Sequence, residues 1–310
     1  MSRTLDRTGR TPAPDGARGP HGTGGDTGAA DPGKPRRRRR GLVSPALAAV
    51  YGALGVLVLL TVFAPGLLAP YEPNDTHVLS AFQAPGAAHP FGTDELGRDV
   101  LSRVIHGART SLTIGVGASA IGVVGGALVG LLAAVGGSRT DQVLMRAMDV
   151  LLAFPELLLA LLVVSVVGAG AGNVLAAIGL AAVPNYARLV RAQALVVLRS
   201  GYVEAAVVLG AGRGTIVLRH VLPNVAGPLL VLATIGTGTA VVSGAALSFL
   251  GLGPAPPTAE WGAMLSEGRE YLATAWWVGV FPGVAVAAVV LSLTLLGRHL
   301  KSRADTGEPS

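Results

Sequence analysis

Few residues of this 310-residue chain could carry catalytic chemistry. Cysteine is absent, which excludes a disulfide framework, a thiolate metal site and a cysteine nucleophile. Residues 28–34 (GAADPGK) match the G-x4-G-K spacing of a phosphate-binding loop, but no apolar strand precedes them and Pro35 replaces the magnesium-binding Ser or Thr. We interpret this match as chance. No H-E-x-x-H, G-x-S-x-G or paired-histidine motif occurs, so we expect no catalytic residue, no metal site and no cofactor bound by this chain. Any energy it uses would come from a partner or an ion gradient.

Two acidic residues lie within or beside a long apolar stretch. Asp149 and Glu156 are seven residues apart, which would place them on roughly one face of a helix, about 10 Å apart along its axis. Ionisable groups at membrane depth are candidate functional residues. For Asp149 we favour a structural tie to Arg146 or a neighbouring loop. Glu156 could line a translocation path and meet an amino terminus or a cation, and Pro155 predicts a kink that brings it inward.

The segment 201–224, GYVEAAVVLGAGRGTIVLRHVLPN, carries the most informative pattern. It predicts a short amphipathic helix, a glycine break, a second short helix and a proline stop. Its longest uncharged run is eight residues, too short to cross a membrane. Its apolar residues, which include Tyr202, favour a surface that awaits a protein partner. The alternative is a helix lying in the membrane interface.

The composition indicates which elements must position these residues. Hydrophobic residues make up 51% of the chain and charged residues 14%, against about 25% charged residues in soluble domains. The mean hydropathy is +0.57. The net charge of +6 comes entirely from residues 1–44, which hold ten Lys/Arg and four Asp. The remaining chain is neutral and apolar, so we predict an integral membrane protein.

Long stretches without charged residues predict six membrane-spanning helices. Four such stretches exceed the roughly 20 residues that a span needs, and a fifth holds only Glu156 and is divided by a glycine-rich break at 168–173. The predicted fold is therefore all-α. The spans are expected near 45–69, 111–136, 147–167, 173–190, 226–249 and 276–297.

Orientation follows from the placement of Lys and Arg, which concentrate in cytoplasmic loops. The segments 71–110 and 251–275 together hold four Lys/Arg against eight Asp/Glu, whereas the other loops and both tails are rich in Arg. Both termini and the 201–224 segment are thus predicted in the cytoplasm, and the protein in the cell membrane. Residues 1–40, which end in five Arg, predict a disordered tail that anchors topology at anionic lipid and binds no nucleic acid.

Small residues recur at four-residue spacing in two predicted spans, where they would allow helices to approach closely. We predict a packing role for them, within the chain or against a partner. They are Gly122, Gly126, Gly130, Gly236, Ala240 and Gly244. The segments 71–110 and 251–275 predict short interfacial helices, and for Trp276 and Trp277 we favour an aromatic belt at the headgroup level.

The 201–224 segment resembles the EAA loop of bacterial ABC importer permeases. The matching positions are Glu204, Ala205, Ala206, Gly210, Leu222 and Pro223. His220 departs from the isoleucine that is common in the broad family, but His-x-Leu-Pro-Asn is common in its peptide-type branch. Segments 89–112, 146–155 and 248–265 are also similar to that branch, so the resemblance extends from residue 45 to about 303.

The resemblance implies the C-type permease subunit of an oligopeptide/dipeptide, or nickel, ABC importer. The expected transmembrane domain is 41–303, followed by a tail at 304–310. Expected partners are a second homologous permease, two ABC ATPases that bind ATP and magnesium, an extracytoplasmic solute-binding protein and membrane lipid. The EAA loop, between helices four and five, would dock on the ATPase. In this interpretation Glu204 pairs with a basic group or caps the helix, Ala205 and Ala206 allow close approach, and Gly210 permits the bend. The alternatives are nickel or a nickel chelate as cargo, an ion-gradient-driven secondary transporter, and a non-transporting membrane scaffold.

Overall fold

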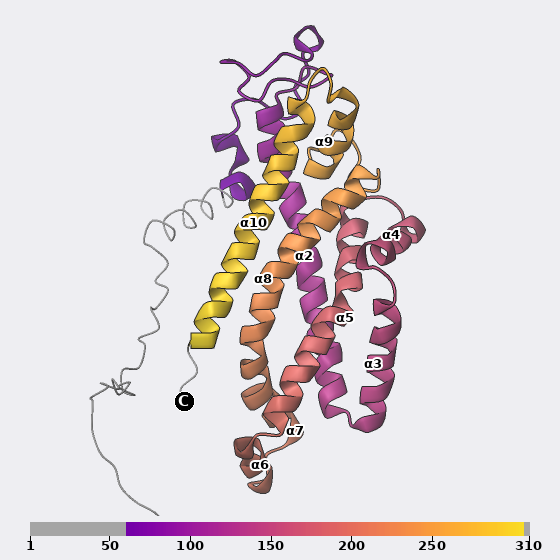
Figure 1. Cartoon of the computed structure of the whole chain (residues 1–310), viewed down its shortest axis with the longest axis vertical. Coiled ribbons are helices and arrows are strands. Elements are labelled where there is room, and N and C mark those ends of the chain that lie inside the picture. Colours follow the sequence, from indigo (N-terminus) through magenta and orange to yellow (C-terminus); the bar gives the residue numbers. More distant parts are fainter. Residues whose placement is uncertain (1–59, 307–310) are drawn as a thin grey trace, which may run out of the picture. The chain divides into compact units, whose positions relative to one another are not determined.

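The computed structural model of the chain describes the backbone of residues 60–306 and the side chains of residues 60–301 (Figure 1). Within this part of the chain, regular structure is helical, and the one β-contact is an isolated bridge between Thr93 and Asp99. The predicted tail 1–40, most of the first predicted span and the end of the predicted tail 304–310 lie outside the described residues.

Among the described residues, four helices are long and apolar enough to cross a membrane: α2 (Val100–Val135), α5 (Ala171–Leu198), α8 (Leu222–Phe249) and α10 (Trp277–Thr306). Each of these helices contains nearly all of one predicted span (111–136, 173–190, 226–249 or 276–297) and extends beyond it at one end or both. Helix α2 begins eleven residues before the predicted start, because the Asp99 carboxylate accepts a hydrogen bond from the Ser102 amide and caps it.

The predicted span 147–167 is wrong as a single helix. The structure has α3 (Ser138–Leu152) and α4 (Glu156–Val167), which meet at 89° across the break 153–155. Pro155 precedes the first residue of α4 and cannot continue the hydrogen bonding of α3, so the expected kink is a complete break. Depending on whether this bent pair is one span, the described residues hold four or five spans.

The predicted proline stop at Pro223 is also wrong. Helix α7 (Arg213–Ile216) continues through a π-helical turn, η3 (Val217–Val221), into α8 without interruption. Proline normally clashes with the carbonyl four residues earlier. The wider π turn directly before Pro223 changes that spacing, which allows the helical backbone to pass through the proline.

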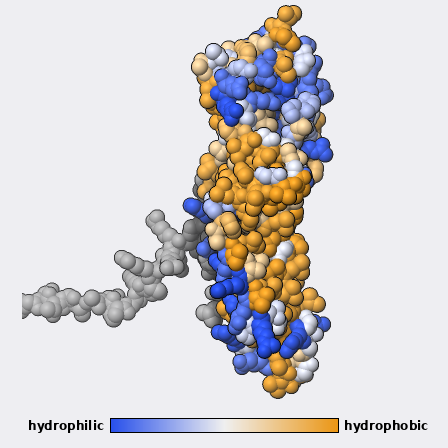
Figure 2. Space-filling model, turned by 90° about the vertical axis from the view of Figure 1, so that its right-hand side faces the viewer, coloured by the Kyte–Doolittle hydropathy of each residue, from blue (hydrophilic) through white to orange (hydrophobic). Residues whose placement is uncertain are grey.

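Shorter elements occupy the two ends of the bundle. They are η1 (Pro65–Leu67), η2 (Val78–Ser80), α6 (Gly201–Val208), α9 (Trp261–Gly268) and η4 (Arg269–Tyr271). Figure 1 shows α6 and α7 at the opposite end from α9. Between these ends, the face drawn in Figure 2 is broadly apolar, with polar side chains gathered toward both ends.

Helices α2 and α5 form the most extensive helix pair. Glycine makes this approach possible, because a Cβ added at Gly126 would lie 2.3 Å from the Tyr186 Cβ, and one at Gly130 would lie 2.6 Å from the Ala187 carbonyl oxygen. Tyr186 and Ala187 are buried at this contact. The α2–α5 pair therefore forms the support on which α4 and α8 pack.

Candidate functional site

The segment 201–224, here called the α6 segment, is held to the bundle by one buried face. Val203 and Ile216 are buried in a cluster with residues of α5 and α8. Its opposite face is open, since Val208 is 86% and Leu209 87% exposed. The segment thus presents apolar side chains on a fixed base at one end of the bundle.

Gly210 ends α6 in a left-handed conformation with φ of +85°. Its amide donates to the Val207 carbonyl, and the next amide, of Ala211, donates to the Ala206 carbonyl. No atom lies within 4 Å of the position of an added Cβ. The requirement for glycine here is conformational and not steric.

The other predicted residues of this segment surround the same surface. Tyr202 is half exposed, receives a hydrogen bond of 3.4 Å from Asn224 and packs against the His220 ring. Glu204 is exposed, and among the described residues its carboxylate has no hydrogen-bond or ion-pair partner. The remaining predicted positions are exposed or half-buried; they are Ala205, Ala206, Leu222 and Pro223.

The structure separates Asp149 from Glu156, because the break between α3 and α4 removes the expected common helix face. Asp149 pairs with Arg188 of helix α5 at 2.5 Å, whereas the expected partner was Arg146 or a neighbouring loop. Asp141 pairs in the same way with Arg191, one turn further along α5. These two ion pairs hold α3 against α5.

Glu156 lies at a largely apolar pocket of about 320 Å³ between α2, α4, α5 and α8, which also holds a few polar side chains. Its carboxylate accepts a hydrogen bond of 3.3 Å from the Asn185 amide. Deeper in the pocket, the Ser119 and Tyr186 hydroxyls are 3.4 Å apart, and Ser119 donates to the Ala233 carbonyl. Sequence spacing identified Glu156 but not these partners, which come from other helices.

The small residues lie at helix contacts within the chain. Gly122 faces the Tyr186 ring, Gly236 faces its hydroxyl, and Gly244 faces Ile114 of α2. Ala240 is buried in the cluster that joins α2, α4, α5 and α8. These residues therefore bring four helices together around the pocket.

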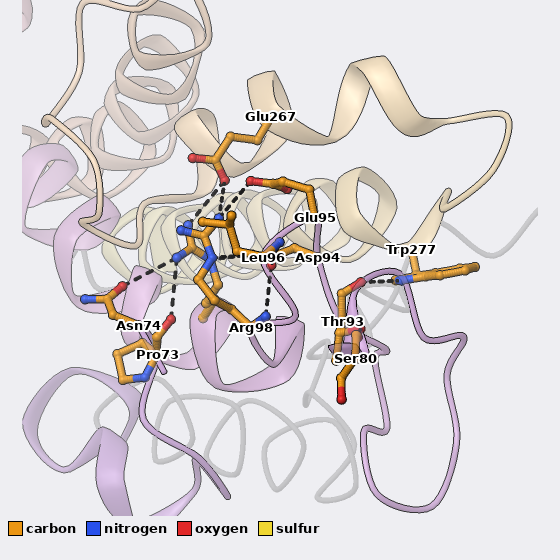
Figure 3. A network of polar contacts seen from close by, with 11 residues as sticks. Pro73, Asn74, Ser80, Thr93, Asp94, Glu95, Leu96, Arg98, Glu267 and Trp277 are labelled. Atoms are coloured by element: carbon orange, nitrogen blue, oxygen red, sulfur yellow. Dashed lines mark hydrogen bonds and ion pairs between the residues drawn. The ribbon is translucent and has the colours of Figure 1, made fainter. Parts of the chain in front are cut away.

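Sequence reasoning missed a buried ion cluster at the α9 end (Figure 3). Arg98 pairs with Asp94 at 2.6 Å and with Glu267 at 3.4 Å, while Arg103 pairs with Glu267 at 3.3 Å and with Asp94 at 3.6 Å. Burial raises the pKa of the Glu267 carboxyl, although both guanidinium groups act in the opposite direction. The available signal was four acidic and two basic residues within the run 94–103 and α9.

Oxygens of Asp94, Glu95 and Glu267 lie within 4.8 Å of one another, a spacing that could suit a metal ion. Arg98 already bonds to all three carboxylates, however, and supplies the opposing charge. We therefore assign the cluster a structural role, tying the segment before α2 to α9.

The expected place of Trp277 in an aromatic belt is wrong. It is 7% exposed, and its indole nitrogen donates to the Thr93 carbonyl at 3.0 Å (Figure 3). Trp276, its neighbour, is 48% exposed. The buried indole fastens the start of α10 to the segment before α2, so it serves packing and not the headgroup layer.

A bundle of long apolar helices with polar ends defines a multi-pass membrane protein. Residues 126–306 match the family described as binding-protein-dependent transport system inner membrane component, and the chain belongs to this family.

Relatives cover most of the chain. It is 42% identical to the di/tripeptide transport system permease protein DppC of Pseudomonas aeruginosa, over 82% of this chain and 88% of the relative. It is also 42% identical to the glutathione transport system permease protein GsiD of Shigella flexneri, over 81% of this chain and 82% of the relative. These relatives are permease proteins and not enzymes.

The fold is similar to that of solved transporters. An inward-facing conformation of the MetNI methionine ABC transporter aligns with a TM-score of 0.53 and 21% identity, covering 64% of this chain and 95% of that chain. An amino acid ABC transporter solved with histidines aligns with a TM-score of 0.50 and 18% identity, over 66% and 93%. At this identity the likeness supports the fold alone.

Proposed function

We propose that this chain is the permease subunit of an ATP-binding cassette importer and forms half of a translocation path for short peptides. The observation that carries the proposal is the α6 segment, which holds the EAA residues on a fixed base with an open apolar face. The names of the relatives, which include di/tripeptide and dipeptide permeases, favour peptide cargo.

In the proposed complex, a second homologous permease completes the path and two ABC ATPases bind ATP and magnesium. An extracytoplasmic binding protein delivers cargo at the α9 end. Both termini and the α6 segment face the cytoplasm, in agreement with the Arg-rich loops. Val208 and Leu209 enter a groove on the ATPase, and Glu204, unpaired within the described residues, is free to meet a basic group there.

In this proposal, movement of the ATPase reaches the membrane helices through a rigid connection. The buried Val203 and Ile216 fix the docked segment to α5 and α8, so movement of the ATPase moves both helices. This chain performs no hydrolysis in the proposal; nucleotide on another chain biases a two-state permease.

Uptake measurements test the class and the cargo together. Parent and deletion cells would be given a labelled dipeptide, a labelled pentapeptide and radioactive nickel, with and without ATP depletion. We expect the deletion to remove an ATP-dependent peptide signal. Loss of nickel uptake alone would assign the chain to a metal importer. Peptide uptake that depends on the chain but follows the proton gradient instead of ATP would favour a secondary transporter.

A further inference from the structure

We propose that the pocket beside Glu156 opens on the translocation path and that the Glu156 carboxylate binds the protonated amino group of the passing peptide. This inference rests on the proposed function for the identity of the cargo. It assigns a recognition residue to this chain and also states which face of the bundle lines the path.

The pocket lies at the middle of the spanning helices. Ser119 lies near the centre of α2, Tyr186 near the centre of α5, and Gly236 and Ala240 near the centre of α8. Ser119 and Tyr186 are buried and form its inner wall. Glu156, Asn185 and Thr239 lie at its open side and are accessible. A volume of about 320 Å³ suits one end of a small ligand better than a long peptide.

The charge of Glu156 is not balanced within the described residues. By contrast, both acids on α3 have Arg partners, since Asp149 pairs with Arg188 and Asp141 with Arg191. Glu156 has only the neutral amide of Asn185. A carboxylate at membrane depth without a cation is costly against lipid, so its open side must face water or protein. A ligand cation entering the pocket would supply the missing charge.

The break between α3 and α4 independently marks the same face. Residues 153–155 are exposed and non-helical directly before Glu156. Backbone that leaves the helix at membrane depth is tolerated where it is buried in protein or lines a water-filled cavity. Because the described residues leave 153–155 exposed, we expect their exposed side to border the path.

The donor set favours an ammonium group over a nickel ion. Besides Glu156, the pocket offers a carboxamide and three hydroxyls, from Asn185, Ser119, Tyr186 and Thr239, and no His. Nickel sites prefer several nitrogen or sulfur ligands. One carboxylate with neighbouring hydroxyl and amide oxygens suits a hydrogen-bonding cation with three N–H donors.

The natural absence of cysteine allows a direct test of the pocket's charge. Thr239→Cys places a single thiol at its open side. In membranes from cells that express the full chain with its partner subunits, the thiol would react with a cationic trimethylammonium-ethyl or an anionic sulfonatoethyl methanethiosulfonate. We expect the cationic reagent to react about tenfold faster, after correction for its rate with a free thiol, because the carboxylate attracts it.

Matched variants test whether the Glu156 carboxylate causes this preference for the cationic reagent. Adding Glu156→Gln should remove the charge preference while leaving reactivity, and adding Glu156→Asp should retain it. Leu291→Cys, on the exposed apolar surface of α10, is the control for a position outside the pocket and should not react. A Thr239→Cys thiol that is inert with and without ATP would overturn the assignment of this face to the path. A preference unchanged by Glu156→Gln would overturn the role of the carboxylate.

Protection by cargo tests the amino group itself. A dipeptide with a free amino terminus, added to the same membranes without binding protein, should slow the reaction several-fold, and its N-acetylated form should not. Equal protection by both forms, or by neither, would reject recognition of the ammonium group. Failure of the proposed function would look different: deletion of the chain would leave peptide uptake unchanged, while the charge preference of the pocket would persist.

Discussion

At the scale of single residues, Gly210 requires glycine for its backbone conformation and not for lack of space. Its φ of +85° costs any L-residue about 1–2 kcal/mol, and proline cannot adopt it. Gly210→Ala should therefore lower uptake and Gly210→Pro should abolish it, with membrane insertion intact. Gly214→Ala is the matched control, because that site is equally open without a positive φ. Normal uptake by Gly210→Pro at normal expression would refute the coupling assignment.

A substitution at Glu204 tests whether the charge of the same proposed docking surface matters. The residue is exposed, so Glu204→Lys should leave folding unchanged while reversing the charge offered to the ATPase. We expect loss of transport with normal amounts of chain in the membrane, measured by uptake and immunoblotting. Wild-type uptake by the Glu204→Lys variant would show that this carboxylate makes no required contact.

Arg103 is expected to matter for stability. It is 1% exposed and pairs with two carboxylates, and removing one partner of a buried ion pair costs about 3–5 kcal/mol. Arg103→Met should lower the thermal unfolding midpoint in detergent well below that of Arg109→Met, which changes an exposed arginine on the same helix. Equal midpoints would mean that the cluster adds no stability.

At the scale of elements, the glycine contacts of α2 set the distance to α5. Gly126→Val places branched carbons where the Tyr186 Cβ and the Ala187 amide already lie, which typically costs about 1–3 kcal/mol. Gly227→Val, on α8 with open space around it, provides the comparison. We expect only Gly126→Val to lower the unfolding midpoint markedly. Similar midpoints for the two variants would contradict close packing at Gly126.

Hydropathy predicted the long helices but not how they are broken or begun. It could not distinguish burial in protein from burial in lipid, so Arg103 appeared to lie in a loop although it is buried in α2 by the ion cluster. The glycine spacing predicted close helix contacts without naming Tyr186 as the partner. The composition of 150–167 was apolar enough for one span, and only the geometry after Pro155 shows the 89° bend.

The two candidate sites also differ in how far the sequence alone could predict them. The α6 segment is contiguous, so its helix, glycine break and apolar face could be predicted from local sequence. The pocket could not, because Ser119, Asn185 and Thr239, which line it together with Glu156, come from three other helices. The tie of Trp277 to Thr93 spans 184 residues, and an indole beside an apolar run gave no local sign of it.

At the scale of the whole molecule, the orientation is testable with single cysteines. Leu79, in η2, and Val208, in α6, are both strongly exposed. With a membrane-impermeant maleimide, Leu79→Cys should be labelled in intact cells and Val208→Cys only after permeabilisation. The reverse pattern would place the α6 segment outside and remove it from contact with any cytoplasmic ATPase.

The uninterrupted helix from Arg213 to Phe249 has a mechanical consequence. At 1.5 Å per residue, its 37 residues form a rod about 55 Å long, with the docking surface at one end and the α9 cap at the other. If the proposed ATPase docks there, this rod would act as a lever, and a tilt of a few degrees at the docked end would displace the far end by several ångströms. This one continuous helix would then coordinate the delivery of cargo on one side of the membrane with the hydrolysis of nucleotide on the other.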